Sequence, residues 1–198
     1  MNWLAHLFLS QPNGADRLGN LFGDLVKLKE RKTLNSCFNK GLKCHLSIDY
    51  FTDNHIVFRH SKKRLDRGSR RYSGVLIDVF YDHFLATNWH CYSQVGLANF
   101  TQEVYQSFEE YWELIPPFPQ IVIYRMIEQD WLASYYYVDG IEATLKRIKA
   151  KLSNKHQEYF VVSHFLAQLE NNYEALEEDF RAFFPEIISH INLWQKLN

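Results

Sequence analysis

The sequence predicts an all-α fold, and three features carry this prediction. Apolar residues recur at intervals of three and four along most of the 198-residue chain, as in Leu18, Leu21, Phe22 and Leu25. No long stretch shows the strict alternation of apolar and polar residues that marks a half-buried strand. Turn-forming Gly, Pro, Asn and Ser residues interrupt the pattern at spacings that suit helices. We therefore expect a single-domain helical bundle that spans residues 1–198.

The turn-forming residues also predict where helices end. The expected breaks fall at residues 11–14, 33–36, 67–69, 94–99, 115–119, 138–140 and 153–154. The last third of the chain carries apolar residues at helical spacing, which favours a core-facing stripe over a cofactor site. These residues are Phe165, Leu169, Tyr173, Leu176, Phe180 and Phe183.

Composition narrows the class of protein. Hydrophobic residues make up 46% of the chain and aromatic residues 16%, enough for a sizeable core without disulfides or a structural metal. A net charge of −1 argues against a protein whose whole surface binds nucleic acid. Cys37, Cys44 and Cys91 are odd in number and form no CxxC pair, so we expect reduced thiols in the core of a cytoplasmic protein.

The N-terminal segment and the hydropathy pattern bear on location. The segment lacks a basic stretch, and His6 interrupts its apolar run, so a signal peptide is not expected. No stretch reaches the roughly 18 apolar residues of a membrane span. We expect a cytoplasmic protein that has neither a membrane nor a nucleic acid as its partner.

His45, Asp49 and Asp53 form the first candidate site. They lie four residues apart in succession, and a step of four on a helix turns the side chain by only about 40°, so the three form one stripe. Imidazole nitrogens and carboxylate oxygens are the usual ligands of a divalent cation. The alternative is a solvated face with Asp53 in a capping position, and the spacing alone favours neither.

Asp78, Asp82 and His83 form the second candidate site. They lie in the apolar helix predicted around residues 78–85, where an ionised carboxylate is costly unless it is paired or binds a metal. Asp78 and Asp82 share a helix face, and His83 is turned by about 100° from Asp82, so the adjacent pair can reach a metal from two directions. The alternative is a salt-bridged Asp and a core His. The first cluster upstream favours the metal.

Asp24 and His6 carry weaker signals. Asp24 ends a polar insertion in an amphipathic segment, and Gly19 and Gly23 are spaced to let another helix approach closely. Helix packing with an exposed Asp24 explains this spacing at least as well as a site does. For His6, near an apolar N-terminus, we expect a core histidine with one hydrogen bond.

A basic stretch covers residues 59–71. Arg70 and Arg71 directly precede the second candidate site, and a guanidinium binds phosphate through two parallel hydrogen bonds. A solvated surface is the alternative and the usual fate of such a charge run. The chain has no GxxxxGK[ST], GxGxxG, GxSxG or paired-cysteine zinc pattern, which leaves metal-assisted hydrolysis as the expected chemistry.

Motifs along nearly the whole chain resemble the acyl carrier protein phosphodiesterase family, regarded as atypical HD-type metal-dependent phosphohydrolases. The matching residues are Asn2–Leu7, Gly19–Leu21 with Asp24, His45 with Ile48 and Asp49, Thr52 and Asp53, Arg70 and Arg71, Asp78 and Val79, Asp82–Leu85, Glu128–Leu132, Tyr173–Leu176 and Phe184–Pro185. Asp82 precedes His83 here, the reverse of the HD dyad, so ligands do not transfer position by position from ordinary HD enzymes.

The resemblance implies an HD-like helical fold and a divalent cation, Mn²⁺ or Mg²⁺. Together with the residue patterns, it predicts metal ligands at Asp24, His45, Asp78, Asp82 and His83. It adds Asp49, Arg70 and Arg71 as further catalytic residues.

The resemblance also implies the reaction. The family hydrolyses the phosphodiester that joins 4′-phosphopantetheine to a serine of holo acyl carrier protein, which gives apo carrier protein and free 4′-phosphopantetheine. Because the carrier protein is acidic, Lys62, Lys63, Arg64 and Arg67 are its expected docking surface. Two alternatives remain at this stage: another HD-like hydrolase that acts on a nucleotide or small phosphoester, and a non-catalytic helical binding module.

Overall fold

The computed structural model describes residues 1–198 and confirms the all-α prediction, since it contains helices and no strands. The α-helices are α1 (Trp3–Phe8), α2 (Gly14–Leu25), α3 (Asn39–Asn54), α4 (Ile56–Arg64), α5 (Ser73–Thr87), α6 (Leu97–Gln106), α7 (Pro117–Glu128), α8 (Trp131–Ser134), α9 (Val138–Ala150), α10 (Asn154–Tyr159), α11 (Val162–Asn171) and α12 (Tyr173–Leu197). Short 3₁₀ segments cover Arg31–Thr33, Ser36–Phe38, Arg70–Tyr72, Trp89–Cys91 and Glu109–Leu114.

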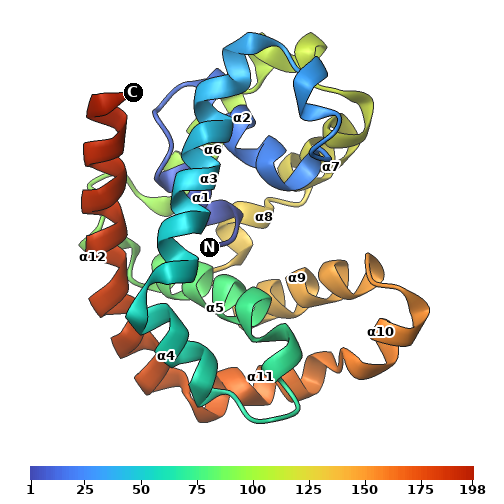
Figure 1. Cartoon of the computed structure of the whole chain (residues 1–198), viewed down its shortest axis with the longest axis vertical. Coiled ribbons are helices and arrows are strands. Elements are labelled where there is room, and N and C mark those ends of the chain that lie inside the picture. Colours follow the sequence, from blue (N-terminus) through green and yellow to red (C-terminus); the bar gives the residue numbers. More distant parts are fainter.

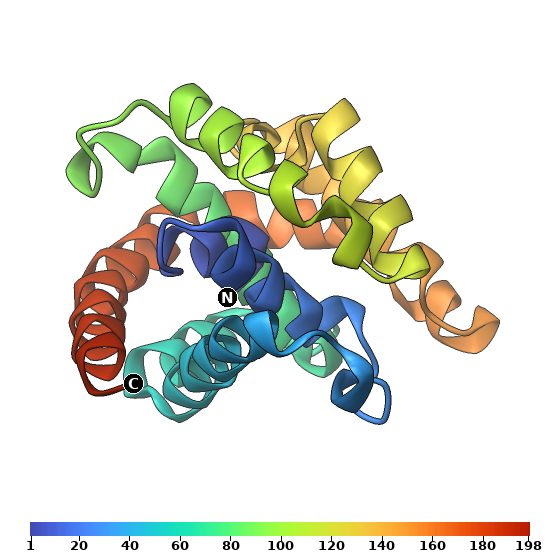
Figure 2. The same ribbon diagram turned by 90° about the horizontal axis from the view of Figure 1, so that it is seen from above.

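The helices surround α1 and α5. Helix α1 packs on α2 and α5, so the N-terminus lies in the middle of the molecule (Figures 1 and 2). The long helix α12 runs along one edge, beside α3 and α4. None of the helices combines the length and the apolar character that crossing a membrane requires.

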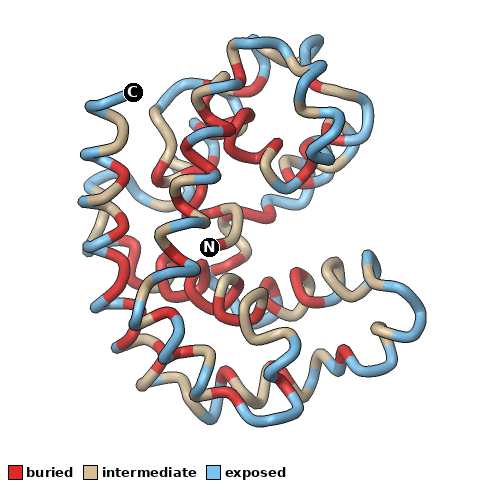
Figure 3. The backbone as a smooth tube through the Cα atoms, in the orientation of Figure 1, coloured by how far each residue is buried: buried red, intermediate tan, exposed pale blue.

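Helix α5 forms the centre of the core. Its residues from Leu76 to Ala86 are buried except for Asp78, which explains why this segment is apolar on every side (Figure 3). The buried apolar side chains form one continuous cluster of 44 residues. That cluster includes Phe165, Leu169, Leu176, Phe180 and Phe183, which confirms the C-terminal stripe as core.

Helices α2 and α3 approach each other closely at glycines. A Cβ on Gly19 would collide with the backbone oxygen of Phe38, and a Cβ on Gly41 would collide with the backbone oxygen of Asp16. The prediction that Gly19 allows a helix to approach closely is therefore confirmed. This contact brings the inner faces of α2 and α3 together at the level of the first candidate site.

Two sequence predictions need correction. Residues 138–140 are the first turn of α9 and not a break. Gly140 lies within this turn and packs closely against the backbone of Ser134, where a Cβ would collide. All three cysteines are free, as expected, but only Cys44 is buried, and Cys91 is exposed.

The contact between α2 and α3 predicts opposite effects for two Gly-to-Ala substitutions. Gly41→Ala should lower the free energy of unfolding by about 1–3 kcal/mol, because the added methyl overpacks the α2–α3 contact. Gly74→Ala is the matched control, since open space surrounds its Cβ, and it should leave stability unchanged or raise it by up to about 1 kcal/mol. Urea unfolding measures both. Equal effects would show that the close approach imposes no constraint.

Candidate metal centre

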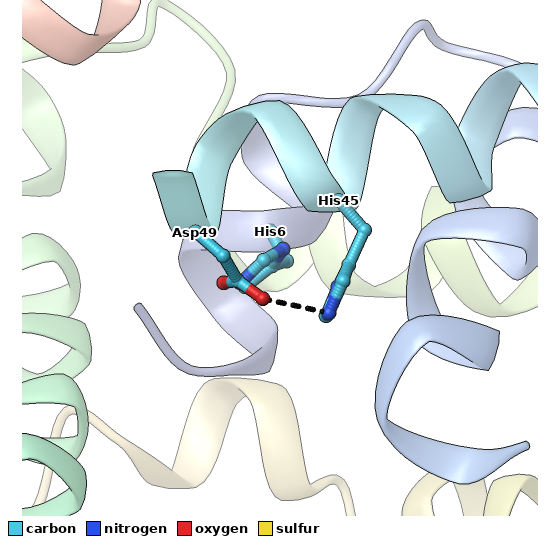
Figure 4. A group of neighbouring side chains, drawn as sticks. All are labelled: His6, His45 and Asp49. Atoms are coloured by element: carbon cyan, nitrogen blue, oxygen red, sulfur yellow. Dashed lines mark ion pairs between the residues drawn. The ribbon is translucent and has the colours of Figure 1, made fainter. Parts of the chain in front are cut away.

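His6, His45 and Asp49 lie side by side, with ligand atoms directed toward one another (Figure 4). Helix α1 carries His6, and α3 carries His45 and Asp49 one turn apart. Nε2 of His45 lies 3.0 Å from Asp49 Oδ2, and Nε2 of His6 lies 3.3 Å from Asp49 Oδ1. One ligand atom from each of the three residues lies within 4.8 Å of the others, which is the spacing of a metal-binding group.

Asn20 orients both imidazole rings. Its Oδ1 accepts hydrogen bonds from Nδ1 of His6 at 2.7 Å and Nδ1 of His45 at 3.2 Å. Its amide nitrogen donates to the backbone oxygen of His6 and to Ser10 Oγ, so the amide oxygen must be the atom that faces the rings. Both Nδ1 atoms therefore carry the proton, and both Nε2 atoms are aimed at the carboxylate.

Burial makes this arrangement informative. The rings of His6 and His45 are 1% and 4% exposed and stack with their centroids 4.5 Å apart. Despite its short distance to Asp49, Nε2 of His6 has no hydrogen bond of acceptable geometry. A buried polar atom without a partner is rare in a native fold, and here it is aimed at the same point as a second imidazole and a carboxylate. A cation at that point fits all three groups.

Asp24 lies at the rim of this group. Its Oδ1 is 3.9 Å from Nε2 of His45, and its Oδ2 accepts a hydrogen bond of 2.9 Å from the indole nitrogen of Trp3. A Cβ on Gly23 would collide with the ring of His45, so the glycine before Asp24 lets the imidazole lie against α2. The structure thus brings Asp24 and His45 together, as the sequence analysis expected.

The carboxyl of Asp49 is held in its ionised form. Burial opposes ionisation, but the adjacent His45 and His6 rings outweigh it when they carry a proton at Nε2, and they place the pKa of Asp49 below its ordinary value. A cation at the same point would act in the same direction. Asp49 thus presents an anionic oxygen to each ring, an arrangement that could hold a metal ion. Its expected role as a catalytic residue stays a prediction. Asp53, the third member of the stripe, is exposed near the end of α3.

Asp78 and Asp82 are not part of this group of three residues, and their expected role as metal ligands stays a prediction. Asp82 is fully buried and accepts hydrogen bonds from the backbone nitrogens of Leu4 at 2.7 Å and Ala5 at 3.3 Å. Asp78 accepts one of 2.7 Å from the amino group of Met1. These carboxylates satisfy the free donors at the start of α1. Burial raises the pKa of Asp82 to about 7, although the α1 donors and the Met1 charge act in the opposite direction.

His83 is buried and lies outside the group of His6, His45 and Asp49, and its expected role as a ligand stays a prediction. Its Nδ1 donates to the backbone oxygen of Tyr135 at 2.8 Å, and its Nε2 accepts from the Tyr173 hydroxyl at 3.0 Å. Neither nitrogen is free for a metal. The turn of about 100° from Asp82 aims the ring away from α1.

The basic stretch is not at the cluster either. Arg70 and Arg71 are exposed, and Arg71 makes its side-chain contact with His156 at 2.7 Å. Arg64 forms two hydrogen bonds of 2.7 and 3.0 Å with the buried carboxylate of Asp179, and its expected role in docking stays a prediction.

Two residues of the centre were missed by the sequence analysis. His6 was assigned to the core, which is correct for its burial but omits its contact with Asp49. Asn20 was named only within a motif. No spacing rule connects them to His45, since 39 and 25 residues separate them from it along the chain; their place in the motifs of the family was the one available signal.

The chain is similar to proteins of known family along its whole length. The family model described as "Acyl carrier protein phosphodiesterase" matches residues 1–187. The acyl carrier protein phosphodiesterase of Serratia proteamaculans is 29% identical over 189 residues, covering 95% of this chain and 96% of that one. Those of Escherichia coli O6:H1 and Yersinia enterocolitica are 28% and 25% identical, covering 95% and 96% of this chain and 96% of each relative. No solved structure matches, so the HD-like fold stays a prediction.

The hydrogen bonds of His83 predict separate effects on stability and on metal binding. His83→Ala should lower the free energy of unfolding by about 2–4 kcal/mol, because it leaves buried partners unpaired and opens a cavity. Its metal content should stay that of the wild type. His45→Ala is the comparison, and it should lose the metal. Elemental analysis measures the metal content of both variants, and thermal melting measures their stability. The reverse pattern of metal content would identify His83 as a ligand.

Proposed function

Because the chain belongs to the acyl carrier protein phosphodiesterase family, we propose that the cluster of His6, His45 and Asp49 is its catalytic centre and holds a divalent cation. As a family member, the chain is a phosphoric diester hydrolase that releases 4′-phosphopantetheine from holo acyl carrier protein. The observation that carries the proposal is the single amide oxygen of Asn20, which aims two buried Nε2 atoms at one ionised carboxylate.

The donor set supports Mn²⁺ as the ion. The carboxylate oxygens suit Mn²⁺, a hard first-row cation that also accepts imidazole nitrogen, and the group contains no thiolate that would favour a softer ion. Mg²⁺ prefers oxygen ligands throughout and a near-ideal octahedron, so two imidazoles make it the weaker match. The shared hydrogen-bond acceptor of the two rings is the kind of outer contact that tunes metal affinity.

The reaction needs water activated for attack on phosphorus. A bound divalent cation supplies that activation and polarises the phosphoryl oxygens. The water oxygen then forms a bond to phosphorus, the bond from phosphorus to the serine oxygen breaks, and the proton lost by water ends on that serine oxygen. Asp24 is placed to accept and pass on this proton, because its Oδ1 faces the cluster while Trp3 holds its Oδ2.

For docking of the carrier protein we propose a reduced basic surface, namely Lys63 and Arg67. Both side chains are exposed to solvent. Lys62 lies with its Nζ 5.0 Å from the centre of the Phe58 ring, and Arg64 pairs with Asp179. Of the four residues expected to dock the carrier protein, only Lys63 and Arg67 are therefore free to bind an acidic partner.

Metal removal tests the catalytic centre. Protein shown to be metal-free should lose hydrolysis of holo carrier protein, and Mn²⁺ should restore it. Asn20→Ala should weaken metal affinity by about 10- to 100-fold, because the rings lose the acceptor that orients them. Asn88→Ala is the matched control, a buried amide whose bonds go to Phe84 and Glu177, and its metal affinity should equal that of the wild type. Full turnover by metal-free protein would refute the proposal.

Kinetics test the docking surface. Lys63→Ala combined with Arg67→Ala should raise KM for holo carrier protein and leave kcat unchanged, because exposed charges act on encounter. Added salt should raise the wild-type KM as well, since screening acts over about 10 Å at 0.1 M. Lys32 and Lys196, two other exposed lysines, serve as the control pair. Equal KM values for both double variants would place docking elsewhere.

A further inference from the structure

A cavity of about 460 Å³ opens beside the candidate metal centre. Residues of α7 and α9 line two of its walls, and residues of α1 and α8 line the rest. These helices are labelled in Figure 1. Seven of its thirteen lining residues are hydrophobic, including Trp3, Val122, Trp131 and Ile148. A volume of this size is in the range of sites that enclose a small organic ligand.

Trp3 connects this cavity to the cluster. Its ring lines the cavity, while its indole nitrogen donates to Asp24, whose other oxygen lies 3.9 Å from His45. The cavity therefore begins where the candidate metal centre ends. A ligand inside it would have one end next to Asp24.

The charges of the cavity are all of one sign. Arg125, Arg147 and Lys151 line it, and none of its lining residues is acidic, although the chain as a whole has a net charge of −1. The ammonium of Lys151 lies 5.6 Å from the centre of the Trp3 ring. Local positive charge in a nearly neutral protein indicates an anionic ligand.

Aromatic stacking holds these groups in place. The rings of Trp3 and Trp131 stack with centroids 5.9 Å apart and an interplanar angle of 18°. The guanidinium of Arg147 lies 4.1 Å from the centre of Trp131 and donates to Thr144 Oγ1 at 2.6 Å. A fixed guanidinium above an indole presents its remaining donors without further loss of side-chain freedom.

We propose that this cavity binds the 4′-phosphopantetheine arm of the substrate, with its phosphate at Lys151 and Arg147 and its chain along the two indoles. This inference rests on the proposed function. The arm combines an anionic phosphate, a dimethyl-substituted carbon and two amides. The cavity offers matching groups, since its cations meet the phosphate, Trp3 and Trp131 meet the apolar carbon, and Asn2 and Gln129 meet the amides.

The position also explains a charge problem at the cluster. The phosphodiester carries a negative charge and must come close to the carboxylates of Asp24 and Asp49, which repel it. Lys151 and Arg147 offset this repulsion on the side from which the arm enters. Lys151 and Arg147 are therefore substrate-positioning residues. The sequence had led us to expect this role in the basic stretch at residues 59–71.

Direct binding tests the proposal with the Mn²⁺-loaded protein. Isothermal titration with 4′-phosphopantetheine should give at least about tenfold weaker binding for Lys151→Ala, because one charge-assisted contact is lost. Pantetheine, which lacks the phosphate, should bind the variant and the wild type equally. Ala150→Trp fills the cavity from the end of α9 and should weaken both ligands. Ala150 and Lys151 are exposed, so the variants should stay folded.

A second readout separates this inference from the proposed function. Both variants should raise KM for holo carrier protein and keep the metal content of the wild type. Ala150→Trp, which leaves Lys151 and Arg147 in place, should also keep the wild-type rate on bis(p-nitrophenyl) phosphate, which has no pantetheine arm. The proposed role of the cavity would be wrong if both variants kept wild-type affinity for 4′-phosphopantetheine and wild-type turnover of holo carrier protein. That outcome would not affect the proposal for the catalytic centre. Absence of turnover in the wild-type protein would overturn the proposed function. The titration would then still test whether the cavity binds 4′-phosphopantetheine.

Discussion

The side-chain amide of Asn20 is the constraint on which the candidate centre depends. From α2 it forms hydrogen bonds to the ring and backbone of His6 on α1, to Ser10 just after α1, and to His45 on α3. An amide has one acceptor and one donor end, so its orientation fixes the proton on both rings at once. The glycine contacts between α2 and α3 bring the helices close enough for these bonds to form.

The aspartates near α1 and the cluster fall into two groups according to the side chains and backbone groups that they contact. Asp78 and Asp82 lie on α5 and take donors from the start of α1, so they orient the helix that carries His6. Asp24 and Asp49 face the imidazoles and are 46% and 43% exposed, so they remain accessible to an ion and to water. The first group contacts the start of α1, the helix that carries His6.

Sequence reasoning predicted the fold and half of the centre for identifiable reasons. Helical periodicity predicts the helices, because each buries an apolar face, and a spacing of four placed His45 and Asp49 on one turn of α3. The argument for Asp82 rested on the compensation that a buried carboxylate needs, and backbone donors supply this compensation as well as a metal does. His6 could not be found by spacing, since its contact with Asp49 exists only after α1 has packed between α2 and α5.

The shortness of α1 has a thermodynamic consequence. Six residues are too few for a helix to persist in water by itself, so α1 is ordered only while it stays packed against its neighbours. Because His6 is on that helix, a cation bound at the cluster stabilises the packed state relative to a locally open one. The free energy that favours the packed state would then increase by RT ln(1 + [M]/Kd), where [M] is the free metal concentration. With a metal at the cluster, the supply of that metal would set the local stability of α1 as well as the chemistry.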